Sequence, residues 1–394
     1  GAAGGSAGGA AGGSAGGAAG GSAGGAAGGS AGGAAGGSAG GAAGGSAGGA
    51  ASTNFMVLRV GIDGGTAAPA SGAAVAAFLD EHDATTGNFV RTITLTSTAN
   101  TPLTISGSAT SDGALSRSGN GQYVTVAGYL AAIGTASVNS AAGVARCVAR
   151  VDAAGAVDTT TVINDAYRGN NFRGATTQDG TVYWLAGAGG TAAEAQDAGV
   201  RTVTHGSSGA STFIFNEVAN TRAVQVSNGV LYVSTGSGGS PDGGASRVFS
   251  LGALPMAPAT QTFLPGVNLT NPQGFAVLDL NTAVAGNDAL YVADTDSSGG
   301  VKKYVLGAGG TWSLAARFLP GLADGGTSTT TCIQATAQRV GNDVIVLCTT
   351  NETNNNRVVR FTDVGGAASD VDAGVTLITA PGFMRYRGVA FSPQ

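Results

Sequence analysis

Residues 273–318 read QGFAVLDLNTAVAGNDALYVADTDSSGGVKKYVLGAGGTWSLAARF, and this stretch decides the fold. It holds short runs rich in β-branched and aromatic residues, at 273–277, 289–292, 301–306 and 312–318. Glycine, asparagine and aspartate separate these runs, which is the pattern of short strands joined by turns. The stretch therefore predicts consecutive antiparallel β-strands, one for each run.

The same pattern recurs along the chain at a spacing of about 50 residues. Each repeat starts with a strand, a tight glycine or asparagine turn, and a strand that carries tyrosine or valine. Such pairs occupy residues 113–126, 173–185, 222–233 and 332–347. Two more strand-like runs follow a pair, at 146–151 and 160–163, at 247–251 and 260–264, and at 357–362 and 375–379. Four strands per repeat at this period are typical of β-propeller blades.

The two ends of the chain supply the strands of one further repeat. Residues 387–391 have the pattern of a first strand, and residues 55–60 have that of a second strand. Residues 76–80 and 89–95 follow as the third and fourth strands. A blade shared by both ends closes the ring without leaving a free sheet edge. We therefore expect an all-β fold, a six-bladed β-propeller over residues 52–394 in which both termini close one blade.

One repeat resembles a known family. The segments NPQGFAV at 271–277 and NDALYVADT at 287–295 resemble the NHL repeat, and NRVVRF at 356–361 follows it in part. The resemblance implies a six-bladed propeller, in agreement with the count made from the strands. It also implies functions that range from protein or RNA binding to metal-dependent lyase or lactonase-like chemistry. The fold alone therefore does not decide the function.

Residues 1–51 contain only glycine, alanine and serine, and GAAGGSAG is repeated six times over residues 1–48. In an extended strand, both faces of this repeat carry only very small side chains, as in silk-type sheets that stack closely. A polyglycine II-like bundle is the alternative ordered form, and a flexible linker is the unordered one. Without charges, aromatic groups or metal ligands, this low-complexity segment has the chemistry of a spacer or an assembly element.

The composition excludes several classes of protein. Charged residues make up 10% of the chain and its formal net charge is -5, whereas nucleic-acid-binding proteins present basic surfaces. No stretch approaches the roughly 18 apolar residues of a membrane-spanning helix. A chain rich in neutral polar residues fits an extracellular or cell-surface protein. We therefore expect no nucleic-acid partner and no transmembrane segment.

The chain has three cysteines, which are too few for a disulfide scaffold. Cys332 and Cys348 flank a strand-turn-strand pattern and are candidates for a disulfide between adjacent strands, which leaves Cys147 over. Three buried thiols are the alternative. Two motifs, at Asn268 and Asn351, fit the N-glycosylation sequon.

The sequence lacks the common catalytic motifs. HExxH does not occur, GxSxG occurs only as GGSAG within the low-complexity repeat, and both histidines, His82 and His205, lie in segments that we expect to be exposed turns or loops. Asp294 and Asp296, together with Asn287, are candidates for a calcium site, although Asp294 occupies a turn position in the family that this repeat resembles. We expect no catalytic residue, no metal and no cofactor, and therefore a protein that is not an enzyme.

Four polar residues share one position, at the beginning of the innermost strand of four repeats. They are Arg173, Arg222, Gln273 and Arg387. Equivalent positions form a ring about a propeller axis, so these side chains are expected at one mouth of the channel. Such a ring has donors for a carboxylate, a sulfate or an acidic sugar. The competing interpretation, which we favour, is that these side chains bridge neighbouring blades through carbonyl or carboxylate groups.

Together these patterns predict a structural subunit of an extracellular filament or surface assembly. Residues 1–51 would pack with copies of the same chain, and the propeller would act as a rigid bead. The first alternative is a secreted propeller that binds a glycan or a protein ligand and is carried on a flexible tether. The second alternative is a hydrolase or lyase of the NHL-like kind.

Overall fold

The computed structural model describes residues 53–61, 71–96, 103–189, 197–237, 246–296, 299–321, 330–366, 370 and 374–394. The repeat at 1–51 and its boundary with residue 52 lie outside the described residues. Apart from a 3-10 turn at Val364–Gly366, every regular element of the described residues is a β-strand. Within these ranges no helix has the length and apolar character needed to span a membrane.

Four separate sheets each hold four antiparallel strands that follow one another along the chain. The first comprises β9 (Phe172–Thr177), β10 (Val182–Gly187), β11 (Gly199–Thr204) and β13 (Thr212–Phe215). The second comprises β14 (Thr221–Ser227), β15 (Val230–Thr235), β16 (Val248–Ser250) and β17 (Thr262–Phe263). The third comprises β18 (Pro272–Leu278), β19 (Ala289–Asp294), β20 (Val301–Leu306) and β21 (Trp312–Phe318). The fourth comprises β22 (Cys332–Val340), β23 (Asp343–Thr350), β24 (Arg357–Asp363) and β25 (Val375–Thr379).

A larger, ten-stranded sheet contains two more antiparallel runs. One run comprises β26 (Arg385–Phe391), β1 (Asn54–Gly61), β2 (Ala74–Asp83) and β3 (Phe89–Thr94). The other comprises β5 (Leu115–Arg117), β6 (Tyr123–Leu130), β7 (Ala145–Asp152) and β8 (Val157–Ile163). The short strand β4 (Leu103–Ser106) pairs with both β2 and β6 and so joins the two runs, and β12 (Ser208–Gly209) pairs in parallel with β8.

The two ends of the described chain meet in one run. Strand β26 pairs with β1, and Phe391 lies opposite Phe55, as the sequence predicts. On its other side, β1 is hydrogen-bonded to β2. The last described strand, β26, therefore belongs to the same sheet as the first two, β1 and β2.

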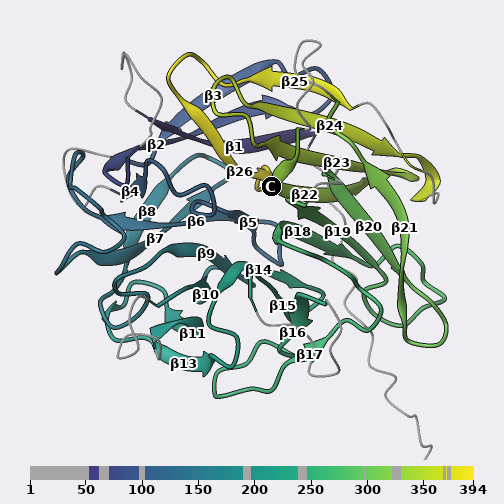
Figure 1. Ribbon diagram of the computed structural model, residues 1–394, viewed down its shortest axis with the longest axis horizontal. Coiled ribbons are helices and arrows are strands. Elements are labelled where there is room, and N and C mark those ends of the chain that lie inside the picture. Colours follow the sequence, from purple (N-terminus) through teal and green to yellow (C-terminus); the bar gives the residue numbers. More distant parts are fainter. Residues whose placement is uncertain are drawn as a thin grey trace, which may run out of the picture. The chain divides into compact units, whose positions relative to one another are not determined.

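The first strand of each run lies innermost, so that the sheets surround a common axis (Figure 1). These strands are β5, β9, β14, β18, β22 and β26, and each contacts the next, with β26 in contact with β5. A ring of sheets whose innermost strands surround an axis is the arrangement of a β-propeller. The described residues therefore form an all-β propeller.

The core lies between neighbouring sheets. Every residue of β19 is buried, because a middle strand has another sheet against each face. Phe318 of the third sheet and Phe361 of the fourth are buried against each other, with ring centroids 5.7 Å apart. Each fully buried aromatic side chain of this kind stabilises the fold by about 1.5–3 kcal/mol relative to an exposed one.

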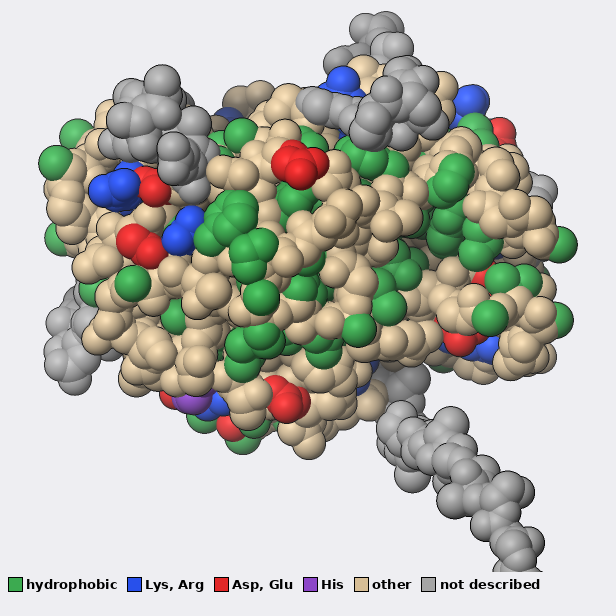
Figure 2. Space-filling view, turned by 90° about the horizontal axis from the view of Figure 1, so that it is seen from below, with side chains coloured by type: hydrophobic (Ala, Val, Ile, Leu, Met, Phe, Trp, Pro, Cys, Tyr) green, Lys and Arg blue, Asp and Glu red, His purple; other side chains and the backbone are tan. Residues whose placement is uncertain are grey.

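The surface of the molecule is mostly neutral. The face shown in Figure 2 carries few charged side chains among many uncharged ones.

Candidate functional site

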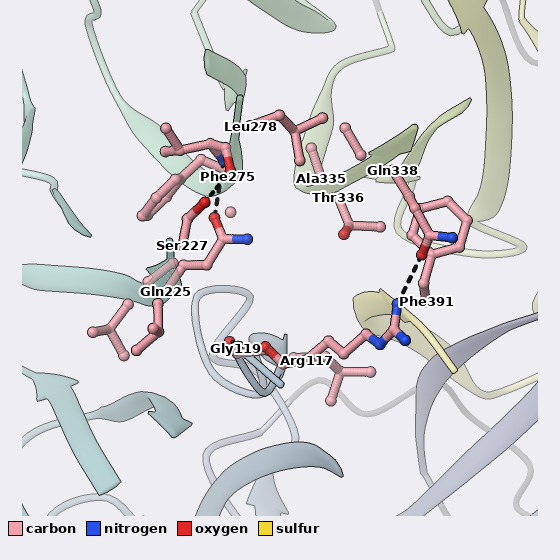
Figure 3. A pocket seen from close by; sticks show the side chains of 18 of the residues that line it. Arg117, Gly119, Gln225, Ser227, Phe275, Leu278, Ala335, Thr336, Gln338 and Phe391 are labelled. Carbon is pink, nitrogen blue, oxygen red and sulfur yellow. Dashed lines mark hydrogen bonds between the residues drawn. The ribbon is translucent and has the colours of Figure 1, made fainter. Parts of the chain in front are cut away.

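A cavity of about 210 Å³ lies on the propeller axis and is lined mainly by the innermost strands (Figure 3). The residues that line it come from β5, β14, β18, β22 and β26 and from the turns that follow β5 and β14. Among its lining residues Arg117 is the only charged one. The cavity therefore presents a largely neutral, polar wall with a single cation.

The polar groups in the wall of this axial cavity are held in place by one another. Arg117 Nη1 donates to Gln338 Oε1 at 2.9 Å, and burial lowers the pKa of the Arg117 guanidinium. Gln225 Oε1 accepts from the Val277 N–H at 3.0 Å, and the Ser227 hydroxyl donates to the Val277 carbonyl at 2.7 Å. Figure 3 shows these bonds crossing between strands. The wall can hydrogen-bond a ligand, but it does not combine a nucleophile with a base.

The ring of residues expected from the sequence lies at the beginning of the innermost strands, directly before cavity-lining residues such as Ala223 and Gly274. These strands begin together at one end of the axis: Ala114 N donates to the Arg173 carbonyl, and Gly388 N donates to the Gly113 carbonyl, both at 3.1 Å. Arg173, Arg222, Gln273 and Arg387 belong to β9, β14, β18 and β26 respectively, each within the first few residues of its strand. We call this region the strand-start end.

Arg173 and Arg387 bridge to neighbouring segments of the chain. Arg173 Nη1 donates to the Thr221 carbonyl at 3.0 Å, and its Nε donates to the Ser111 hydroxyl at 3.1 Å. Arg387 is 1% exposed, and its Nη2 donates to the Gly107 carbonyl at 2.8 Å. These bonds fit the bridging interpretation for these two side chains.

A buried carboxyl group, Asp112, lies near these two arginines. Burial raises the pKa of Asp112 to about 6, while the Tyr129 hydroxyl, which donates to Oδ2 at 2.8 Å, and the charges of Arg173 and Arg387 act in the opposite direction. The sequence does not single this residue out, because a lone aspartate before glycine has the pattern of an ordinary turn. Asp112 offsets part of the positive charge at the strand-start end.

Arg222 and Gln273 differ from the other two members of the ring. Within the described ranges Arg222 donates no hydrogen bond, and its Nε is buried without a partner. Burial, followed by repulsion from Arg173 and from Arg247, lowers the pKa of Arg222 to about 10. The Gln273 side chain is buried, and its Oε1 accepts no hydrogen bond from any described residue. These two groups are therefore available to a ligand.

Arg247 was missed by the sequence analysis. Its Nη1 donates to the Gly236 carbonyl at 2.7 Å, and its Nε is buried without a partner among the described residues. It precedes β16 rather than an innermost strand, so the comparison of equivalent repeat positions did not reveal it. Its charge nevertheless acts on Arg222.

The expectation that His82 lies in an exposed turn is wrong. His82 is in β2 and is buried, with its ring stacked on Phe55 at 5.6 Å and its Nδ1 2.9 Å from the Gly87 carbonyl. The strand continues through the charged run because Arg59 and Arg91 pair with its carboxylates. The other histidine is in a turn, as expected, and its Nδ1 lies 3.0 Å from the Tyr183 hydroxyl.

The residues suggested for calcium do not converge. Lys302 Nζ lies 2.8 Å from Asp294 and 2.7 Å from Asp296, so both carboxylates already have a cation. Asn287 instead donates to the Tyr232 hydroxyl at 3.1 Å. No group of three or more histidine, cysteine, aspartate or glutamate side chains in the described ranges has a metal-binding arrangement.

A disulfide joins Cys332 and Cys348, whose Cα atoms are 5.7 Å apart on β22 and β23. Cys147 is a buried free thiol, and burial raises its pKa to about 12. A thiol of this kind is unreactive, because the thiolate is the nucleophile. Both sequon asparagines, Asn268 and Asn351, are exposed.

No family model matches the chain, and no curated protein is similar to it. Among solved structures, TolB from Acinetobacter baumannii is 10% identical, with a TM-score of 0.49 over 88% of this chain and 68% of that one. The periplasmic gluconolactonase PpgL from Pseudomonas aeruginosa is 13% identical, with a TM-score of 0.44 over 85% of this chain and 100% of the other. Similarities this distant carry no argument about the fold. The pairing and contacts of the strands define the β-propeller by themselves.

Proposed function

We propose that residues 52–394 form one six-bladed propeller in which both ends of the chain close one blade. The four separate sheets and the two runs inside the ten-stranded sheet support this count. The pairing of β26 with β1 supports the shared blade. Strand β4 then serves as a connector between two blades, because it pairs with β2 on one side and with β6 on the other.

We infer that this propeller is a binding module whose ligand lies on its axis. The observation that carries this inference is the pair of buried polar groups at the strand-start end, Arg222 and Gln273, that lack partners among the described residues. Buried polar groups in folded proteins are nearly always hydrogen-bonded, so groups left without partners at one end of a channel favour a missing ligand. The adjoining axial cavity supplies room for a further contact.

We propose binding rather than catalysis, because both histidines of the chain are engaged elsewhere. The His82 ring is buried between Phe55 and Phe89. His205 contacts Tyr183 and lies 3.4 Å from Asp158. Neither histidine lines the axial cavity, whereas a general base must lie within hydrogen-bond reach of its substrate. A hydrolase or lyase of the NHL-like kind is therefore the weaker proposal, and hydrolysis of a lactone by the full chain would favour it.

The binding proposal is tested by screening the full chain against a glycan array and a small-molecule set. Two single variants then locate any ligand: Arg222→Gln at the strand-start end and Gln338→Ala in the axial cavity. We expect at least one ligand whose affinity falls tenfold or more in one of these variants. The absence of any ligand, or a ligand whose affinity changes in neither variant, would contradict an axial site.

A second candidate function rests on the repeat of residues 1–51. We propose that this segment packs with copies of itself and that the chain is then a subunit of an extracellular filament or surface assembly. Electron cryomicroscopy of the full chain and of a chain that lacks residues 1–51 tests this proposal. Ordered filaments that vanish on truncation would support it. Monodisperse particles from both chains would contradict it and would make residues 1–51 a tether for the binding module.

We further propose that the protein works outside the cytosol. The Cys332–Cys348 disulfide supports this location, because disulfides persist mainly in oxidising compartments. Cell fractionation of the native host protein, with its thiols alkylated at lysis, tests the location. A reduced pair in a cytosolic fraction would contradict it.

A further inference from the structure

Positive charge accumulates at the strand-start end although the whole chain has a net charge of -5. Arg222 is repelled by both Arg173 and Arg247, and Arg387 is repelled by Arg385. Among the described carboxylates, only Asp112 acts on these charges, and it acts on Arg173 and Arg387. Within the described ranges, Arg222 is therefore left with neighbouring cations and no counter-ion.

We propose that Arg222, Arg247 and the amide of Gln273 form a binding site for the carboxylate group of an acidic ligand. This inference rests on the axial binding function proposed above and names the chemical class of its ligand. An arginine guanidinium presents a planar fork of donors that matches the two oxygens of a carboxylate. Gln273 carries a neutral NH2 donor, and its Oε1, which has no partner among the described residues, would accept from a hydroxyl group of the same ligand.

The backbone brings the two arginines to one residue, Gly236. The Arg222 guanidinium lies over this glycine so closely that a Cβ atom there would clash with its Nε. The Gly236 carbonyl accepts the Arg247 Nη1 hydrogen bond at 2.7 Å. A residue without a side chain thus allows both guanidinium groups to approach the same peptide unit.

A single hydroxyl group holds Gln273 beside the start of β14. The Ser234 hydroxyl donates to the Gln273 carbonyl at 2.7 Å and accepts from the Ala223 N–H at 3.1 Å. Ala223 directly follows Arg222, so this bridge fixes the distance between β14 and β18 at the strand-start end. The three proposed binding residues therefore come from a connected part of the scaffold rather than from separate loops.

The charge balance explains why a carboxylate suits this site. A guanidinium that is taken out of water costs free energy unless a charged or polar partner compensates it. Burial and the two neighbouring arginines lower the pKa of Arg222 to about 10, so its cation is less stable here than in water, although it stays charged at neutral pH. A bound carboxylate reverses both effects, because an opposite charge nearby favours the cation.

The bridging arginines do not share this role. The Arg173 guanidinium already donates to Ser111 and Thr221, and Asp112 compensates its charge. Arg387 is 1% exposed and donates through Nη2 to Gly107, whereas Arg222 donates to no described residue, although the Nε of Arg387 also has no partner in the described ranges. The ring of four equivalent positions is thus divided into two structural residues and two ligand-binding ones, and Arg247 completes the site.

The experiment measures binding of glucuronate to the full chain by calorimetry, with glucose as the matched neutral sugar and sulfate as an inorganic anion. The variants are Arg222→Gln and Arg247→Gln, with exposed Arg339→Gln as the control. We expect glucuronate to bind the wild type and the control, at least tenfold more weakly to the other two variants, and more weakly at higher salt. Glucose should not bind at this site.

Several outcomes separate this inference from the axial binding function. If a neutral ligand from the screen binds the axis while glucuronate and sulfate do not bind, the carboxylate site is overturned and the binding function remains. If nothing binds, both are overturned. Sulfate that binds as tightly as glucuronate, with the same loss in Arg222→Gln, would support an anion site but overturn the preference for carboxylate.

A second measurement does not depend on the choice of ligand. Without ligand, Arg222→Gln should melt at the same temperature as the wild type or higher, because the change removes a repelled cation. A drop of several degrees would show that Arg222 has an internal partner and would overturn the proposal.

Discussion

Replacing Asp363 by alanine should destabilise the propeller strongly, because it removes the buried carboxylate that pairs with the ammonium group of Lys303. Lys303 Nζ on β20 lies 2.6 Å from Asp363 Oδ2 on β24, and the two side chains are 1% and 2% exposed. The Tyr291 hydroxyl donates to the same carboxylate oxygen at 2.6 Å. The pair therefore joins two neighbouring sheets through a fully desolvated contact.

The size of the effect follows from the burial. Removing one partner of a buried ion pair costs about 3–5 kcal/mol, since the remaining charge is uncompensated. With an unfolding entropy of about 2.1 cal/mol/K per residue, a propeller of roughly 340 residues has about 0.7 kcal/mol/K in total. We therefore expect the melting temperature of Asp363→Ala to fall by about 4–7 °C. The Gly366 carbonyl, 2.7 Å from Lys303 Nζ, limits the loss by remaining as an acceptor.

Scanning calorimetry and urea unfolding of a double-mutant cycle measure this energy. The double variant Lys303→Met with Asp363→Leu should recover most of the stability, because an apolar pair of similar volume avoids the desolvation cost. Tyr291→Phe is the matched control and should lose about 1.5–3 kcal/mol, the usual range for one hydrogen bond to a charged group. A melting temperature of Asp363→Ala within 1 °C of the wild type (about 0.7 kcal/mol), or a double variant no better than Asp363→Ala, would refute the reasoning.

Three further predictions concern titratable and sulfur-containing side chains. Burial raises the pKa of Asp112 to about 6, so the contribution of Asp112 to stability should be fully present below about pH 4 and should be lost, by about 3 kcal/mol, as the pH rises through 6. Asp112→Asn should flatten this part of the profile in urea unfolding, and an unchanged slope would contradict the assignment. Reduction of the Cys332–Cys348 disulfide, whose cysteines are 16 residues apart, should cost about 3 kcal/mol; calorimetry with and without reductant measures this loss, and an unaltered melting temperature would argue against it. Burial raises the pKa of Cys147 to about 12, so Ellman's reagent should find no thiol in the native protein and one in denaturant without reductant, whereas rapid labelling of the native protein would contradict its burial.

The strand pattern of the propeller could be read from the sequence because each strand is a local signal. The run expected at 289–292 is the strand Ala289–Asp294, and the expected pairing of the two chain ends is present as Phe55 opposite Phe391. Strand β4 was missed, because its four residues are too few to show a period and its pairing with two other strands is a tertiary effect.

The burial of His82 could not be predicted from the neighbouring sequence, for a different reason. The segment Asp80-Glu81-His82-Asp83 has the composition of an exposed turn. Its carboxylates are buried because Arg59, on the neighbouring strand β1, and Arg91, on β3, supply the opposite charges. Local composition does not show which distant side chain will neutralise a charge, so a polar strand between two charged strands is easily mistaken for a loop.

The candidate site was found in part from the repeat. Equivalent positions led to Arg222 and Gln273, because a propeller places them at the same end of the axis. Arg247 and Asp112 were missed, since one precedes an outer strand and the other lies before β5 rather than within it. The division of the ring into bridging and unpartnered arginines depends on individual hydrogen bonds, which no repeat pattern contains.

The pairing of β1 with both β26 and β2 has a mechanical consequence. A tension applied through the residues before Asn54 and directed along β1 pulls against two ladders at once, so many hydrogen bonds resist it together. A force that separates Phe55 from Phe391 instead opens the β1–β26 ladder one pair at a time from the chain ends inward. The propeller should therefore withstand a pull on a tether attached before β1 far better than a pull that draws its two termini apart.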